Sequence, residues 1–150
     1  MANALSDVVA EELSRSYVEQ RVVDWANRIE ELFEQIEQWL PAGWRAERRG
    51  GVLMDEELMR RHGVPARELP QLHLAASNRV TASVIPTGLW VIGANGRLDF
   101  RAPAGQFAIV DKAETDLNRA NPPHWVIAPL RDRLRARDLT EEALREALAA

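Results

Sequence analysis

Three short runs rich in apolar residues lie between Gly88 and Asp111, at 88–94, 97–102 and 106–111, and runs of this length are typical of β-strands. Asn95-Gly96 separates the first two runs, and both residues accept the positive φ of a type I′ hairpin turn. We therefore expect antiparallel strands at 88–94 and 97–102, joined by a two-residue turn, followed by a strand at 106–111.

One face of this expected meander is apolar. A second turn of four residues, 102–105, sets Phe107 opposite Phe100 and Ile109 opposite Leu98. A shift by one residue would scatter these side chains over both faces of the sheet. The register therefore predicts that this face forms the core, under the N-terminal helix.

The opposite face is mixed in character. The two-residue turn sets Trp90 beside Arg101 and Ile92 opposite Asp99. An aromatic ring beside an arginine can form a cation–π pair, and this composition is typical of interface hot spots. The alternative is that Trp90 and Ile92 are sheltered under the C-terminal segment.

A long helix is predicted over residues 6–40, because apolar residues recur there every three or four positions. Ser6 or Asp7 is the expected N-cap, and Pro41 with Gly43 ends the helix. Such a helix is about 50 Å long at a rise of roughly 1.5 Å per residue. Its N-terminal part is therefore expected to overhang the sheet and to pack on a partner.

After the long helix we expect a connection at 41–53, with Gly50-Gly51 as its flexible point, and a short helix at 56–61 that is capped by Asp55 and ended by Gly63. Further strands are expected at 71–76, 79–85 and 125–128. A helical turn is expected at 113–119, and Thr140 caps a final helix. Residues 129–138 fit either a helix begun at Pro129 or a polar edge strand. Together the elements predict one α+β domain over 1–150: a long N-terminal helix packed on a mostly antiparallel meander of five or six strands, with a short C-terminal helix.

Composition narrows the class of protein. The 150 residues are 46% hydrophobic and 28% charged, which suits one folded domain. The net charge of −4 argues against a general binder of nucleic acid or acidic membranes, and the absence of cysteine excludes disulfides and thiolate metal sites. With no membrane-span-length apolar run and no signal-peptide pattern, a cytoplasmic location is expected. Lys112 is the only lysine among 19 basic residues, which indicates a GC-rich bacterial genome.

Asp99, Asp111 and Lys112 are the first candidates for chemistry. They are loosely similar to the pattern of restriction-type nucleases, in which an Asp on one strand and Asp/Glu-x-Lys on the next hold Mg²⁺ and orient water. Asp111 and Lys112 are adjacent, so on a strand they point to opposite faces unless a bulge intervenes. The alternative is a solvated strand residue at Asp99 and an ordinary strand end at Asp111.

No other catalytic or cofactor motif is present. His62, His73 and His124 are far apart and none has a ligand at zinc-site spacing. No nucleophile elbow or phosphate-binding glycine loop occurs. We therefore expect no cofactor and no metal.

Two groups of arginines remain. Arg45, Arg48 and Arg49 cluster beside Trp44, and a run of alternating arginines occupies 131–137. On a strand the arginines of this run would share one face, which could bind phosphate or an acidic protein. The alternative is a solvated edge strand that its charges protect from aggregation.

The sequence favours a non-enzymatic protein-interaction or accessory module that acts as a homodimer or with another protein. The candidate interaction residues are Trp90, Ile92, Asp99, Arg101, Arg131, Arg133, Arg135 and Arg137. The alternatives are a metal-dependent, possibly degenerate, nuclease that uses Asp99, Asp111 and Lys112, or a nucleic-acid binder that uses the arginine run.

Overall fold

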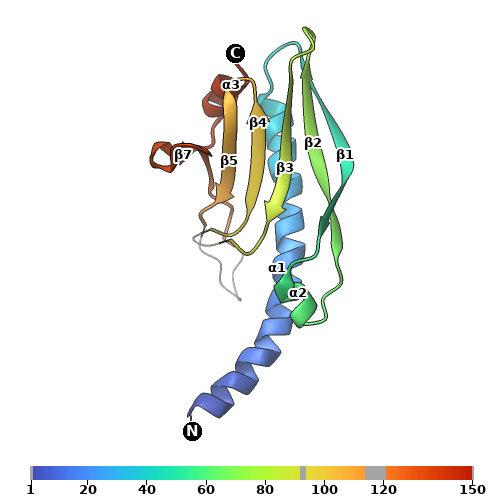
Figure 1. The fold of residues 1–150 in the computed structure, drawn as a ribbon, viewed down its shortest axis with the longest axis vertical. Coiled ribbons are helices and arrows are strands. Elements are labelled where there is room, and N and C mark those ends of the chain that lie inside the picture. The colour runs from blue at the N-terminus through green and yellow to red at the C-terminus, as the bar shows by residue number, and fades with distance from the viewer. Residues whose placement is uncertain (1, 92–93, 114–120, 150) are drawn as a thin grey trace.

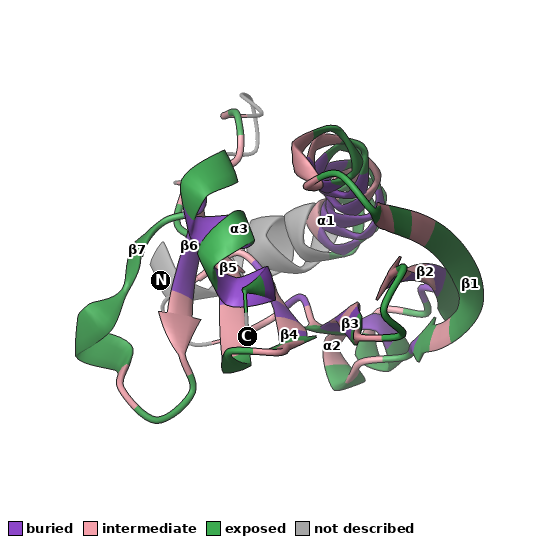
Figure 2. Cartoon of the chain, turned by 90° about the horizontal axis from the view of Figure 1, so that it is seen from above, coloured by how far each residue is buried: buried purple, intermediate pink, exposed green. Residues whose placement is uncertain are grey.

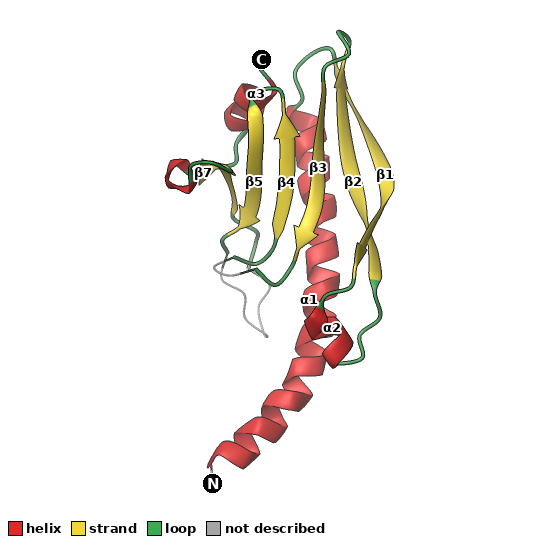
Figure 3. Cartoon of the chain, viewed as in Figure 1, coloured by secondary structure: helices red, strands yellow, loops and turns green. Residues whose placement is uncertain are grey.

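The structure is a computed structural model, and it describes residues 2–91, 94–113 and 121–149, with side chains from Arg15 onward. Seven strands form one antiparallel sheet in chain order, with a long helix before it and a short one after it (Figures 1 and 3). The elements are α1 (Ala2–Trp39), β1 (Trp44–Met54), α2 (Glu57–Arg61), β2 (Arg67–Ala76), β3 (Thr81–Gly88), β4 (Arg97–Ala102), β5 (Gly105–Asp111), β6 (Trp125–Pro129), the 3-10 turn η1 (Arg133–Arg135), β7 (Arg137–Asp138) and α3 (Glu141–Leu148). The predicted α+β class is confirmed, with seven strands in place of five or six.

The two longer helices lie on the same side of the sheet. Seen from above, the sheet curves around α1, and α3 lies beside it over β5 and β6 (Figure 2). The buried stripe of α1 includes Trp25, Ile29, Phe33 and Ile36, at the three- and four-residue spacing of one helix face. The N-terminal part of α1 runs past the end of the sheet, as the sequence predicts (Figure 1).

The predicted pairing of β4 with β5 is confirmed. Phe100 lies opposite Phe107 and Leu98 opposite Ile109, across the turn from Ala102 to Gly105. The two phenyl rings are 5.9 Å apart between centroids. Leu98, Phe100 and Ile109 are fully buried on the face that α1 and α3 cover.

The predicted hairpin at Asn95-Gly96 is wrong. β4 pairs with β3, so that Val84 lies opposite Phe100, and the described residues 89–91 and 94–96 lie outside the strands of the sheet. The predicted pairs of Trp90 with Arg101 and Ile92 with Asp99 are therefore wrong as well, because β3 already occupies that edge of β4. Ile92 itself lies outside the described residues.

Asn95 and Gly96 contact β5 and α1 instead of forming a hairpin turn. The Asn95 N–H donates to the Asp111 carbonyl, and the Asp111 N–H donates to the Gly96 carbonyl. Gly96 has a φ of +122° and lies against the Trp25 ring, where a Cβ would come within 2.3 Å of a ring carbon. The glycine is therefore required for close packing against α1 rather than for a two-residue turn.

The stretch predicted as a connection at 41–53 is mainly strand β1. Trp44 and Ala46 turn toward the core side, but the exposed arginines and glutamate between and after them leave little apolar alternation to find in the sequence. The register shifts between Arg49 and Val52, at Gly50-Gly51, so these glycines form a bulge within the strand.

Residues 129–138 form neither the predicted helix nor one edge strand. The segment ends β6, turns, forms η1 and then adds the two-residue strand β7. The helical turn predicted at 113–119 falls, apart from Ala113, outside the described residues.

The predicted ends of the short helices are mostly confirmed. Gly63 has a φ of +68° and follows α2, and the Val64 N–H returns to the Met59 carbonyl at 2.8 Å. The Thr140 hydroxyl accepts the Ala143 N–H at the start of α3. Asp55 does not cap α2, since the N-cap position is Glu56 and no side chain caps it.

Candidate interaction face

The face of the sheet turned away from α1 is here called the outer face, and in the part of the chain that the structure describes α1 and α3 both lie over the opposite face (Figure 2). The register places Glu47 beside His73, His73 beside Ser83, and Ser83 beside Arg101, in one row across β1 to β4. Leu72 and Leu74 are buried on the other side, which confirms that His73 faces away from the core. The outer face therefore gathers polar side chains from four strands.

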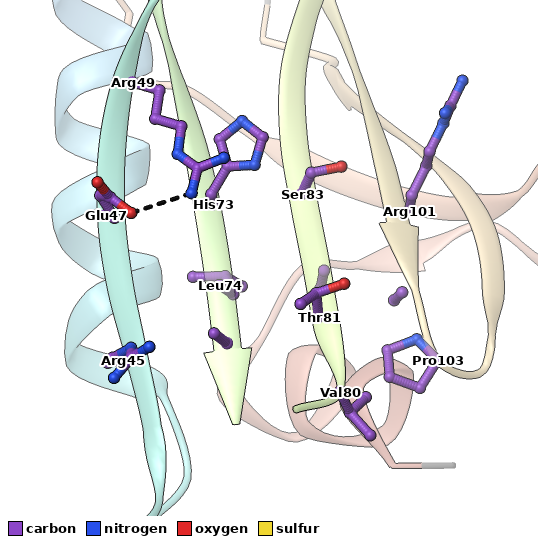
Figure 4. Close-up of a pocket in the computed structure, with 13 residues that line it drawn as sticks. Arg45, Glu47, Arg49, His73, Leu74, Val80, Thr81, Ser83, Arg101 and Pro103 are labelled. Carbon is purple, nitrogen blue, oxygen red and sulfur yellow. Dashed lines mark hydrogen bonds and ion pairs between the residues drawn. The ribbon is translucent and has the colours of Figure 1, made fainter. Parts of the chain in front are cut away.

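A groove of about 480 Å³ lies over this row (Figure 4). We call it the arginine groove; its lining is Arg45, Glu47, Arg49, His73, Leu74, Ala75, Val80, Thr81, Ala82, Ser83, Arg101, Ala102 and Pro103. Arg49 donates to Glu47 at 3.2 Å. Arg45 and Arg101 make no ion pair with any described residue, so their guanidinium groups are available to a ligand.

Glu47, His73 and Ser83 have the residue types of a hydrolytic triad, but they are not bonded as one. His73 Nε2 is 2.9 Å from Gln71 Oε1, and the Glu47 carboxylate accepts from Arg49. A triad needs the base within hydrogen-bond reach of both nucleophile and acid. In the part of the chain that the structure describes, the row therefore lacks the hydrogen bonds of a triad.

A second groove of about 410 Å³ lies over β4 to β6, beside the segment that leads to β7. We call it the apolar groove; its lining is Val91, Ala94, Arg97, Ala108, Val110, Lys112, Val126, Ala128, Pro129, Leu130, Arg133 and Ala136. Nine of these residues are apolar and three are basic. Arg97 is paired with Asp99 at 3.0 Å.

The predicted interaction residues fall in different places. Arg101 lies in the arginine groove and Arg133 in the apolar groove. Asp99 lies on the outer face and binds Arg97. Trp90 is half-buried, packs against the core cluster, and has a buried indole nitrogen with no partner among the described residues.

The arginine run does not form one face. Arg131 lies in a turn, Arg133 and Arg135 in η1, and Arg137 in β7. Arg135 pairs with Asp132 at 3.3 Å and Arg137 pairs with Glu146. The structure thus distributes these charges around a loop.

Leu134 stands in that loop with 97% of its surface exposed. Asp132 accepts the Leu134 N–H and holds the turn.

The nuclease-like residues are not brought together. Asp99 is on the outer face, whereas Asp111 is fully buried on the inner side of the sheet. The Asp111 carboxylate accepts from Arg28 at 2.8 Å and from the N–H groups of Ala113 and His124 at 2.9 Å. These bonds make it a structural anchor, and within 2–91, 94–113 and 121–149 no group of three acidic or histidine ligands could hold a metal.

Sequence reasoning missed the row from Glu47 to Arg101, because β1 was not predicted as a strand. The alternating Arg45, Glu47 and Arg49 were the available signal. It also missed Arg28 as the partner of Asp111, since no local pattern pairs residues 83 positions apart.

None of the helices in the described part of the chain is long and apolar enough to cross a bilayer. Comparison with known proteins gives no family: no family model matches the chain, and no curated protein or solved structure is significantly similar to it.

Proposed function

We propose that the protein is a non-enzymatic interaction module whose arginine groove binds an acidic, extended segment of a partner protein. The observation that carries the proposal is that Arg45 and Arg101 lack ion-pair partners in the described part of the chain. Both line the groove without an ion-pair partner among the described residues, in a chain whose net charge is −4. Guanidinium groups without an ion-pair partner on the outer face favour carboxylate ligands, which they bind with two parallel hydrogen bonds.

The spacing of the two arginines supports an extended ligand. Arg45 is on β1 and Arg101 on β4, three strand spacings apart, or roughly 15 Å at about 4.8 Å per strand. Thr81 and Ser83 add hydroxyl groups between them. An extended chain covers that distance in about four or five residues, so acidic side chains at such a separation would reach both guanidinium groups.

A protein segment fits this groove better than a nucleic acid. The lining contains no Trp, Tyr or Phe on which bases could stack, and it includes the carboxylate of Glu47. Nucleic-acid binding, one of the alternatives from the sequence, therefore becomes a competing outcome of the test.

Fluorescence anisotropy tests the proposal. The probes are a labelled peptide of alternating glutamate and serine, the same peptide with lysine in place of glutamate, and single-stranded DNA. We expect only the glutamate peptide to bind, and R45Q or R101Q to weaken it about tenfold, the scale of a lost charge-assisted hydrogen bond. The matched control is R131Q, because Arg131 is exposed and lies outside the groove.

Two results would refute the proposal: peptide affinity unchanged in both groove variants, or tighter binding of DNA than of peptide. The homodimer expected from the sequence stays a prediction, since a single chain does not test it. Light scattering after size-exclusion chromatography is the measurement for it.

A further inference from the structure

We infer that the apolar groove is a separate site for a small aliphatic carboxylate. Its floor is an apolar cluster on the outer face, away from the main core. Val126 is only 8% exposed, yet it does not belong to the core cluster that holds the other buried Val, Leu, Ile, Met, Phe, Trp and Ala side chains of the described residues. Val110 lies opposite Val126, and Ala108 lies opposite Ala128, so four small apolar side chains form two rows across β5 and β6.

The small size of these residues creates the space. Alanine at 94, 108, 128 and 136 leaves room that larger side chains would fill. Val91 and Ala94, joined by an isolated bridge, border the groove on one side, and Leu130 with Ala136 borders it on the other. A bordered volume of about 410 Å³ is within the range of small-molecule sites.

The basic residues at the groove favour a ligand with a negative charge. Its lining holds Arg97, Lys112 and Arg133 and no carboxylate. Arg97 forms an ion pair with Asp99, whereas Arg133 forms no ion pair with the described residues. An apolar floor beside a guanidinium group suits a ligand with an alkyl body and an anionic end.

Calorimetric titration of the full chain with octanoate tests the inference, with octylammonium and acetate as controls. Octylammonium keeps the alkyl body and reverses the charge, whereas acetate keeps the charge and removes the body. We expect octanoate to bind at least about tenfold more tightly than either, because both parts of the site contribute. Equal binding of octanoate and octylammonium, or no binding of octanoate, would overturn the inference.

Two variants locate the site. A128L fills the floor and R133Q removes the unpaired charge, and each should weaken octanoate about tenfold. The matched controls are A75L, an alanine of the arginine groove, and R131Q, an exposed arginine outside both grooves. Circular dichroism confirms that each variant is folded. Octanoate affinity that follows A75L instead of A128L would contradict the assignment.

This inference and the proposed function fail separately. The glutamate peptide reports on Arg45 and Arg101, and octanoate reports on Ala128 and Arg133. Loss of one ligand with the other retained therefore identifies which groove has been misassigned.

Discussion

Arg28 and Asp111 form an ion pair of 2.8 Å across 83 positions of the chain, with side chains that are 4% and 0% exposed. Asp24 binds the same guanidinium at 2.7 Å and also binds Arg21 at 2.8 Å. Arg21 and Arg28 further donate to the carbonyls of Asn95 and Asn121. This network connects the middle of α1 to the end of β5, to Asn95 before β4 and to Asn121 before β6.

Removing one partner of this pair should destabilise the fold strongly. D111A leaves the Arg28 guanidinium buried without its closest carboxylate on the sheet, and we expect a loss of about 3–5 kcal/mol in the free energy of unfolding. Urea denaturation measures it. The control is E19A, which breaks the exposed Arg15–Glu19 pair and should cost less than about 1 kcal/mol. The double variant R28M/D111L should cost much less than D111A alone; if it costs more, the buried charge is not the cause.

Gly96 should tolerate no side chain. G96A would place a Cβ 2.3 Å from the Trp25 ring at a φ of +122°, so overpacking adds to backbone strain. We expect a loss of about 3 kcal/mol or more in stability. G105A is the matched variant, since Gly105 has a φ of +147° and no atom within 4 Å of a Cβ. It isolates the strain, and equal losses in the two variants would mean that the contact with Trp25 is irrelevant.

The Glu56 carboxylate should hold the residues that directly follow β3. It accepts the N–H groups of Leu89 and Trp90 at 3.0 and 3.3 Å. E56Q replaces one acceptor with a donor, so we expect faster hydrogen exchange at these two amides and a loss of about 1–2 kcal/mol. E57Q is the neighbouring control, because the Glu57 side chain is 82% exposed. Unchanged exchange in E56Q would show that the carboxylate does not hold this segment.

Leu134 should be dispensable for folding. With 97% of its surface exposed, L134S should change the unfolding free energy by no more than about 0.5 kcal/mol. The same substitution at the fully buried Leu144 should cost about 3 kcal/mol or more, because it removes a packed side chain and buries a hydroxyl. Thermal denaturation of both variants compares them directly. A large loss in L134S would mean that the loop packs on something in solution.

The sequence predicts best the elements whose side chains alternate clearly. Phe100, Phe107, Leu98 and Ile109 are large and apolar, so only one register gathers them on one face, and the structure has that register. Most of α1 follows from the same reasoning at a period of 3.6, although the helix begins at Ala2, so the expected N-cap at Ser6 or Asp7 is wrong. These elements needed no tertiary information.

The wrong predictions have a common physical cause: contacts with residues far away in the chain override the local sequence pattern. Asn95-Gly96 has the local chemistry of a hairpin turn, but β3 extends to Gly88 and pairs with β4 first. The glycine is then used against Trp25, a contact that no local pattern reveals. The candidate site was misplaced for the same reason, because Arg101 was matched with Trp90 instead of with Ser83.

The strict chain order of the sheet also bears on how the protein is made. Every strand pairs with its successor, so the sheet can form by the pairing of consecutive strands, without contacts between strands far apart in the chain. The ribosome, however, releases α1 before any of the strands on which it rests. The apolar stripe of the nascent helix stays uncovered until these strands have formed, and this interval is when a newly synthesised copy is most exposed to aggregation.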